Sequence, residues 1–209
     1  MRGDEGPGSG RRQPYRGKRA FDLVVVALAA VPAAVLAAGC GVAVKLSSQG
    51  PVLFRQTRVG RDGRTFSALK FRTMRDAPEG NPLFPDDDRI TPVGRVLRRL
   101  SLDELPQLLN VVRSEMSVVG PRPAPVYQVT RYDDRQRRRL AVRPGLTGLA
   151  QVRGRNQIYW AERIEHDLEY LDRQTIWLDL RILAKTCSAV VAGSGGHPRD
   201  DPIARPPAG

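Results

Sequence analysis

An apolar segment near the N-terminus constrains this chain more than any other feature of its sequence. Residues 21–44 read FDLVVVALAAVPAAVLAAGCGVAV, and no charged residue stands between Asp22 and Lys45. A helix of about 20 such residues is long enough to span the hydrocarbon core of a bilayer. Basic residues precede the segment, as in a signal peptide, but the apolar run is long for one. We therefore expect a membrane-embedded helix over residues 15–45, with a signal peptide and a buried core helix as the alternatives.

Two details of this segment bear on how it enters a membrane. Pro32 stands in its middle, where a proline removes one helix hydrogen bond and kinks or breaks the helix. Basic residues lie on both sides of it: Arg11, Arg12, Arg16, Lys18 and Arg19 before, and Lys45, Arg55, Arg58 and Arg61 after. Because basic flanks favour the cytoplasmic side, two of them indicate a helix that enters, breaks at Pro32 and returns to the same face. The length alone also permits a simple span.

Composition excludes several classes of protein. The 209 residues include 34 Lys and Arg against 22 Asp and Glu, a net charge of +12. The hydrophobic share of 41% is too high for a disordered chain. Two cysteines and two histidines make a disulfide framework and a histidine zinc site improbable. The positive charge therefore points to an acidic partner, which is nucleic acid, anionic lipid or a phosphorylated substrate.

The rest of the chain divides into a body and two tails. Residues 1–14 are predicted to be a disordered basic tail and residues 193–209 a flexible tail. Between the apolar helix and the second tail, residues 46–192 are expected to form one domain. Its predicted elements are a β-hairpin (52–58 and 65–72), a loop (76–92), four helices (92–100, 103–112, 126–140 and 159–172) and a last helix (175–191). The expected fold class is α+β, mostly helical, with a small hairpin and amphipathic interfacial helices.

The densest group of chemically useful side chains lies around two neighbouring carboxylates, Asp103 and Glu104. Ser101 and Glu104 have the spacing of a capping box, whereas Pro106 fits better if Asp103 is the N-cap. Either arrangement places both carboxylates at a helix N-terminus, where the helix dipole also favours a bound phosphate. A Mg²⁺ ion shared with phosphate oxygens would relieve their mutual repulsion. Plain helix capping with exposed ion pairs is the alternative.

Other cationic residues stand in turns that suit an anion. Two prolines stiffen the turn around Arg122, and Lys70 ends the second hairpin strand. A glycine-rich loop over 143–148 is followed by Gln151 and Arg155, and its glycines permit close approach of the backbone to an anion. Each of these signals is weak alone, since ordinary turns and solvated strand ends look the same. The run at 135–139 is interpreted as a solvated or lipid-facing surface.

Five motifs occur in a fixed order along the chain. They are KRAFD (18–22), KFRTM (70–74), SLDELPQ (101–107), MSVVGPRP (116–123), and RPGLTG (143–148) with Gln151 and Gly154-Arg155-Asn156. In this order they resemble the bacterial sugar transferase family, the monotopic polyprenyl-phosphate phosphoglycosyltransferases, in its minimal form. The resemblance runs from about residue 18 to residue 190.

The resemblance implies a reaction and roles for particular residues. Such enzymes transfer a sugar 1-phosphate from a UDP-sugar to undecaprenyl phosphate with Mg²⁺ and release UMP, as the first membrane step of exopolysaccharide or glycoconjugate synthesis. By carry-over, Asp103 would be the nucleophile, and Glu104 would hold Mg²⁺ with it or activate the acceptor. Contacts to phosphates or the nucleotide would come from Lys70, Arg98, Arg122 and Arg155, with Asp179 or Asp167 completing the site.

The resemblance also implies a location. The family's apolar helix is re-entrant and broken at a proline, which matches Pro32, and it keeps the catalytic domain on the cytoplasmic face of the bacterial inner membrane. Anionic lipid is an expected partner and nucleic acid is not. The alternative is a membrane-anchored basic binding or scaffold protein without enzymatic activity, but no helix-turn-helix or RRM-like pattern supports it.

Overall fold

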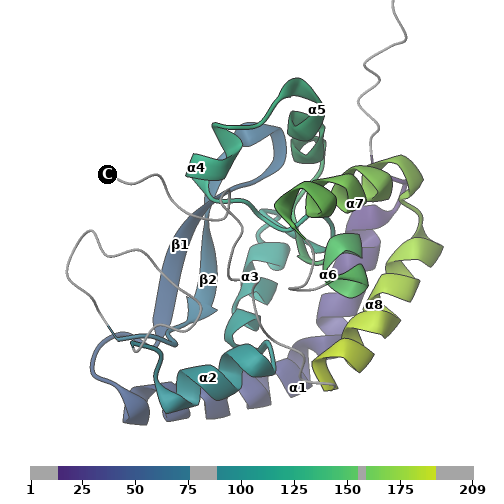
Figure 1. Cartoon of the computed structure of the whole chain (residues 1–209). Coiled ribbons are helices and arrows are strands. Elements are labelled where there is room, and N and C mark those ends of the chain that lie inside the picture. The colour runs from purple at the N-terminus through teal and green to yellow at the C-terminus, as the bar shows by residue number, and fades with distance from the viewer. Residues whose placement is uncertain (1–13, 76–88, 155–158, 192–209) are drawn as a thin grey trace, which may run out of the picture.

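The computed structural model of the chain describes residues 14–75, 89–154 and 159–191 (Figure 1). The predicted tails, apart from Pro14, lie outside these residues, as do most of the predicted loop at 76–92 and one predicted site residue, Arg155. Within the described residues the fold is α+β and mostly helical, with a long apolar N-terminal helix and two small sheets. The fold class predicted from the sequence is confirmed at this level.

The apolar segment forms helix α1 (Lys18–Ser47), which contains Pro32. Among the described residues it is the one helix whose length and composition suit a membrane span, and only 6% of its most apolar window is buried. That exposure weighs against the core helix of a soluble protein. Large apolar side chains such as Leu28 and Val31 are 78% and 75% exposed, so the middle of the helix has no protein partner in the described structure.

The predicted break at Pro32 is wrong in its strict form, because α1 continues as one helix through the proline. The helix is bent instead: Figure 1 shows its first half running down past α8 and its second half turning along the underside of α2. A proline removes only one helix hydrogen bond, so the flanking turns continue helical while the axis changes direction. The two halves pack on different clusters, Val26 with Val118 and Tyr170, and Cys40 and Val44 with Phe71 and Leu97.

The predicted hairpin is present. Strands β1 (Leu53–Val59) and β2 (Thr65–Phe71) pair antiparallel through a turn, η1 (Arg61–Gly63). Asp62 and Gly63 adopt positive φ angles of 56° and 78°, which the Asp-Gly pair tolerates. Because Phe54 pairs with Lys70 and Arg58 with Phe66, the side chains of Arg58 and Lys70 lie on the same face of the hairpin.

A second, parallel sheet was missed by the sequence analysis. It joins β3 (Ser117–Val119) to β4 (Gly145–Thr147). Glycine is required here for close packing, since a Cβ on Gly145 would lie 2.1 Å from the nitrogen of Gly120, and one on Gly148 would lie 2.2 Å from its carbonyl oxygen. The glycines of the 143–148 loop therefore serve backbone contact with Gly120 within the fold.

The helices agree with prediction where the apolar pattern is long. The three predicted at 92–100, 159–172 and 175–191 are α2 (Pro92–Arg99), α7 (Trp160–Arg173) and α8 (Ile176–Val191). The helix predicted at 103–112 is instead the 3-10 turn η2 (Leu102–Glu104) followed by α3 (Gln107–Val112). The basic helix predicted at 126–140 is divided into α4 (Val126–Val129), α5 (Asp134–Arg137) and η3 (Arg138–Ala141), and the short α6 (Leu149–Arg153) was not expected.

The basic run around α5 forms ion pairs with acidic residues of α7. Arg135 pairs with Glu165, Arg138 with Asp172, and the buried Arg139 with Asp167. The interpretation of this run as a solvated or lipid-facing surface is therefore wrong for Arg139, which is buried, whereas Arg135 and Arg138 form their ion pairs at the exposed surface. Their pairing fastens the α4–η3 segment onto α7.

Candidate active site

The two neighbouring carboxylates lie in the short turn η2 between α2 and α3. Ser101 precedes η2 with a left-handed backbone (φ 57°) and no capping hydrogen bond from its side chain. Neither predicted capping arrangement is present, because the side chain of Glu104 bonds to Lys70 and Arg122, and Pro106 rather than Asp103 is the N-cap of α3. A left-handed backbone at a serine is strained, and such conformations are common at functional sites. Here it changes the direction of the chain after α2, so that Asp103 and Glu104 lie in a separate turn rather than in a continuation of that helix.

Glu104 is held by two cations from different parts of the fold. Its Oε1 accepts from Lys70 Nζ of β2 at 2.8 Å and from Arg122 Nη2 at 2.7 Å. Its side chain is 15% exposed. Burial, the largest influence, acts to raise its pKa, but the charges and hydrogen bonds of Arg122 and Lys70 together lower that pKa far below its ordinary value. Glu104 is therefore ionised at any physiological pH, and it fixes the positions of both cations.

Asp103 differs from its neighbour in having no hydrogen bond or ion pair within the described part of the chain. The residue is only 8% exposed. Burial is the main cause that raises its pKa, and the negative charge of Glu104 adds to it, against the opposing charges of Lys70, Arg98 and Arg122. A carboxylate that is buried, ringed by cations and not itself engaged is suited to bond with an incoming electrophile.

Arg98 reaches the same region from the last turn of α2. Its Nε donates to Thr73 Oγ1 at 2.8 Å, and its charge lowers the pKa of Asp103. The start of α2 is fixed by Thr91, which caps it through Gly94 N, and by a close approach in which a Cβ on Gly94 would lie 2.1 Å from Thr73 O. The predicted residues Lys70, Arg98, Asp103, Glu104 and Arg122 are thus brought together from four separate elements.

The turn that carries Arg122 is pinned from two sides. Arg139 Nη2 donates to the carbonyl of Arg122 at 2.9 Å, and Arg58 Nη1 donates to the carbonyl of Pro123 at 3.4 Å. The backbone of Val59 also bonds to Ala124 at 2.9 Å. The rigidity that two prolines predict for this turn is therefore reinforced by contacts from β1 and η3, which fix the base of the Arg122 side chain.

The two C-terminal aspartates bond to residues other than the dyad and its cations. Asp167 is buried and pairs with Arg139. Arg139 also donates to the backbone carbonyl of Arg122, whose side chain binds Glu104, so Asp167 is connected to Glu104 only indirectly. Asp179 is fully buried and accepts from Tyr15 at 2.9 Å, Tyr170 at 2.8 Å and Lys18 at 2.8 Å. No contact joins either carboxylate to Asp103 or Glu104 within the residues that the structure describes.

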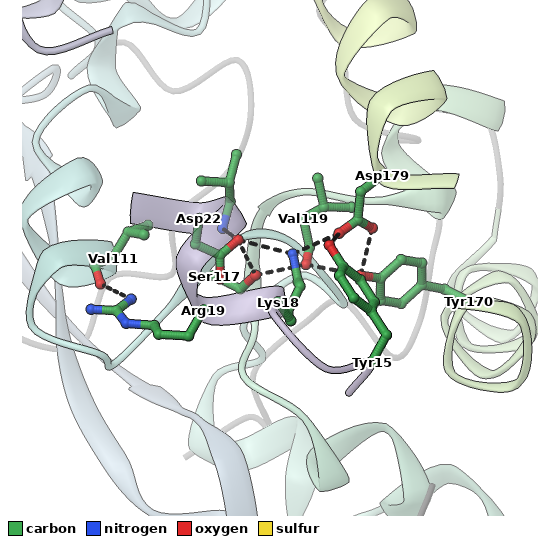
Figure 2. A network of polar contacts seen from close by, with 10 residues as sticks. Tyr15, Lys18, Arg19, Asp22, Val111, Ser117, Val119, Tyr170 and Asp179 are labelled. Atoms are coloured by element: carbon green, nitrogen blue, oxygen red, sulfur yellow. Dashed lines mark hydrogen bonds and ion pairs between the residues drawn. The ribbon is translucent and has the colours of Figure 1, made fainter. Parts of the chain in front are cut away.

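Asp179 belongs to a polar network that fastens the start of α1 to the body (Figure 2). Lys18 Nζ lies 2.8 Å from Asp179 and 2.9 Å from Asp22. Asp22 accepts in turn from Ser117 Oγ at 2.9 Å and from the backbone N–H of Val118 at 3.1 Å. The network therefore ties the first turn of α1 to β3, whose chain continues directly into the Arg122 turn.

The donor set fits a magnesium ion only in part. Within the described residues no group of three or more His, Cys, Asp or Glu side chains converges. Mg²⁺ is commonly held by one or two carboxylates together with substrate phosphates and water, and the unengaged carboxylate of Asp103 suits that mode. Glu104 has one oxygen committed to Lys70 and Arg122. Asp103 is therefore the stronger candidate of the two predicted ligands.

The sequence analysis gave no site role to Arg58, Thr73 or Arg139. Strand alternation places Arg58 on the face of Lys70, so that signal was present in the sequence. Thr73 and Arg139 are recognised only through contacts with Arg98 and Arg122 that join distant segments. Arg72, which precedes Thr73, is buried and donates to the backbone carbonyl of Ser48, directly after α1.

Known proteins are similar to the whole described chain. Residues 13–193 match the family model described as bacterial sugar transferase. The uncharacterized sugar transferase EpsL of Bacillus subtilis is 43% identical over 180 residues, which cover 85% of this chain and 89% of EpsL. The exopolysaccharide production protein ExoY of Sinorhizobium fredii is 40% identical, with coverage of 86% and 88%.

A third relative is named for its reaction. The UDP-glucose:undecaprenyl-phosphate glucose-1-phosphate transferase of Caulobacter vibrioides is 43% identical over 195 residues, covering 86% of this chain and 72% of the relative. The family match spans the apolar helix, the hairpin, the Asp103–Glu104 turn and the Arg122 turn alike. The chain belongs to the bacterial sugar transferase family.

Proposed function

We propose that this protein transfers a sugar 1-phosphate from a UDP-sugar to undecaprenyl phosphate, as a polyprenyl-phosphate sugar-1-phosphate transferase. The observation that carries the proposal is the pairing of two unlike carboxylates, Glu104 clamped by Lys70 and Arg122, and Asp103 buried beside them without a partner in the described structure. Relatives named for glucose 1-phosphate transfer to undecaprenyl phosphate support the substrate classes. Glucose is the sugar that these relatives suggest first.

In the first step a carboxylate oxygen of Asp103 attacks the sugar-linked phosphorus of the UDP-sugar. A bond forms between that oxygen and phosphorus, the bond from phosphorus to the bridging oxygen breaks, and its electron pair leaves with UMP. In the second step a phosphate oxygen of undecaprenyl phosphate attacks the same phosphorus and displaces the carboxylate. The lipid diphosphate sugar is the product, and Asp103 is regenerated.

The cations around the dyad supply the stabilisation that this reaction needs. Phosphoryl transfer depends on positioning and on neutralising charge at the phosphate oxygens. Lys70 and Arg122 are already aimed by Glu104, and Arg98 by Thr73, so they need little reorganisation when the substrate binds. Asp103 together with the second oxygen of Glu104 would hold Mg²⁺. The bound ion would neutralise negative charge on the phosphate oxygens.

The way α1 is attached to the body supports the membrane position that we propose. A straight helix of 30 residues would extend about 45 Å and carry one end across a bilayer. Here the first turn is bonded to Asp179 and Ser117 of the body, and Cys40 and Val44 near the other end are buried against Phe71 and Leu97. Attachment of both ends to one body supports a helix that enters the bilayer and returns to the same side. The basic residues that flank the helix support the cytoplasmic face of the bacterial inner membrane, with residues 46–192 against anionic lipid.

The test is release of UMP by the full-length protein in detergent with undecaprenyl phosphate and Mg²⁺. A panel of UDP-glucose, UDP-galactose and UDP-N-acetylglucosamine identifies the sugar, and we expect one of them to give turnover. Asp103→Asn should abolish turnover while circular dichroism stays that of the wild type. Mass spectrometry of wild-type protein quenched without acceptor should find a sugar phosphate on Asp103. Full activity of Asp103→Asn would refute the mechanism.

A further inference from the structure

A fourth cation stands near the dyad without a carboxylate of its own. Arg58, the penultimate residue of β1, forms no ion pair with any residue in the described ranges. Its guanidinium is held by Gln56 Oε1 at 2.6 Å and by the carbonyl of Pro123 at 3.4 Å. These two contacts use two of its five N–H donors. The group is therefore fixed in place with donors left to bind something else.

The charges around Arg58 are unbalanced. Burial is the main cause that lowers its pKa, and repulsion by Arg122 adds to it, bringing the pKa to about 10. Glu104 is the nearby carboxylate that opposes this, but it is already bonded to Lys70 and Arg122. A half-buried cation that has a cationic neighbour and no carboxylate of its own destabilises the protein, unless a bound ligand brings negative charge.

The order of the charges indicates which part of a ligand would reach Arg58. The guanidinium of Arg58 donates to the carbonyl of Pro123, the residue that follows Arg122. The side chain of Arg122 in turn binds Glu104, the residue that follows Asp103. Arg122 therefore links Arg58 to the turn that carries the nucleophile. If the sugar-linked phosphoryl group lies at Asp103, the second phosphoryl group of a diphosphate extends past Arg122 toward Arg58.

We infer that Arg58 binds the nucleoside-linked phosphate of the UDP-sugar and of the UMP product. This inference rests on the proposed function, because it assumes a diphosphate whose other phosphorus reacts with Asp103. Arg58 shares the hairpin face of Lys70, so one strand pair presents a cation to each phosphoryl group. A planar guanidinium with free donors forms paired, charge-assisted hydrogen bonds to phosphate.

The test measures the affinity of the full-length protein for UMP in detergent by calorimetry, without acceptor lipid. Arg58→Gln keeps a donor for the carbonyl of Pro123 but removes the charge, whereas Arg58→Met removes both. We expect both variants to bind UMP at least about tenfold more weakly, and Arg58→Lys to recover part of the loss. The matched control is Arg55→Gln, which removes an exposed arginine from the opposite face of β1 and should bind UMP as the wild type does.

Three outcomes would overturn the inference. They are no UMP binding by the wild type, UMP affinity of Arg58→Gln within twofold of the wild type, and an equal loss in Arg55→Gln. Near-normal binding by Arg58→Gln together with weak binding by Arg58→Met would assign Arg58 to holding the turn alone. A failure of the proposed function looks different: UMP would bind with the expected dependence on Arg58, but no UDP-sugar would release UMP.

Discussion

The guanidinium of Arg139 donates to the backbone carbonyl of Arg122 at 2.9 Å, so a buried arginine of η3 fixes the residue that binds Glu104. Arg139 is 6% exposed and also bonds to Tyr132 and Asp167. The chain of contacts from Asp167 to Arg139, to Arg122 and to Glu104 connects α7 with the dyad. Asp167, which the family resemblance suggested as a substrate ligand, is in this structure the counter-ion of Arg139.

Arg139→Met should destabilise the protein strongly, because it leaves the buried carboxylate of Asp167 without a partner. Removing one member of a buried ion pair costs about 3–5 kcal/mol in the free energy of unfolding. The double variant Arg139→Met with Asp167→Leu should recover most of that stability. It should not recover turnover, since the anchor on the Arg122 carbonyl is still missing. Denaturant titration and UMP release measure the two properties separately.

The control for this prediction is Arg135→Met, which breaks the exposed pair with Glu165 on the same segment. Exposed ion pairs contribute little to stability because water and salt screen them, so the stability and turnover of this variant should stay close to wild type. If the Arg139–Asp167 double variant turned over substrate at the wild-type rate, Arg139 would contribute to stability alone and not to positioning Arg122 for the reaction.

Asp103→Asn should raise the thermal stability of the protein while it removes activity. Burial and the neighbouring charge of Glu104 raise the pKa of Asp103, so the ionised form present at pH 7 is disfavoured in the folded state. A raised pKa gives a stabilising contribution at low pH that is lost as pH rises through that pKa. The neutral amide removes this cost, and we expect the Tm at pH 7.5 to rise by a few degrees.

The same reasoning makes the stability gain depend on pH. At pH 4 the wild-type carboxyl is more often protonated, so the difference in Tm between Asp103→Asn and wild type should shrink. If the gain in Tm stayed constant from pH 4 to pH 8, the charge on Asp103 would not be its cause.

Glu104 should show the opposite dependence. Its pKa is lowered by Arg122 and Lys70, so its contribution is present above the ordinary value of 4.5 and is lost as pH falls below it. Glu104→Gln should therefore cost most stability near neutral pH, by about 2–4 kcal/mol for two cations left beside a neutral amide. The cost should diminish progressively as pH falls below about 4.5 toward the lowered pKa. Urea titrations across that range measure it.

Asp134→Asn is the matched control for Glu104→Gln. Asp134 is an exposed carboxylate in the first turn of α5, without an ion pair among the described residues. Its replacement should change the free energy of unfolding by less than about 0.5 kcal/mol at every pH. A cost of Glu104→Gln that grew toward acid pH would reverse the sign expected for a lowered pKa.

Asp179→Asn should affect stability much more than substrate affinity. Asp179 accepts from Tyr15 and Tyr170 and pairs with Lys18, and the carboxylate is fully buried. We expect a loss of about 3 kcal/mol in unfolding free energy and an unchanged KM for the UDP-sugar in the folded protein. Tyr170→Phe should cost about 1 kcal/mol, since one hydrogen bond is lost.

A large rise in KM with little loss of stability would instead return Asp179 to the substrate site that the family resemblance suggested. Tyr159→Phe controls for the tyrosine substitution, because that side chain is 66% exposed and should be neutral in both measurements.

The parts of the fold that the sequence predicted correctly are those with long local patterns. Helices α2, α7 and α8 follow from apolar periodicity, and the hairpin from alternation with an Asp-Gly turn. Strands β3 and β4 have three residues each, too few for a period to appear, and their pairing depends on the close approach of Gly120 and Gly145. The helix expected at 103–112 begins only at Gln107, because residues 102–104 form a 3-10 turn and Pro106, which has no N–H to donate, stands at the N-cap of α3.

The site could be predicted as a set of residues but not as an arrangement. The carboxylates and cations stood out as charges in stiff turns, yet Asp103 and Glu104 looked equivalent until their partners were known. The difference between them comes from Lys70 and Arg122, which reach Glu104 from 34 and 18 positions away. Likewise Tyr15 and Asp179 are separated by 164 positions, so their hydrogen bond left no local signal.

Both ends of α1 should be reached by reagents from the same side of the membrane. The start of the helix is bonded to Asp179, and its far end packs on Phe71, so a single span would have to break one attachment. Arg16→Cys and Gln49→Cys place thiols at exposed positions on either side of the helix, in a background where the exposed Cys187 is replaced by serine. In spheroplasts, a membrane-impermeant maleimide should label neither position until the membrane is permeabilised. Pro32→Ala, which restores the missing backbone donor, should weaken the bend and lower turnover. Labelling of one position alone in intact spheroplasts would establish a simple span.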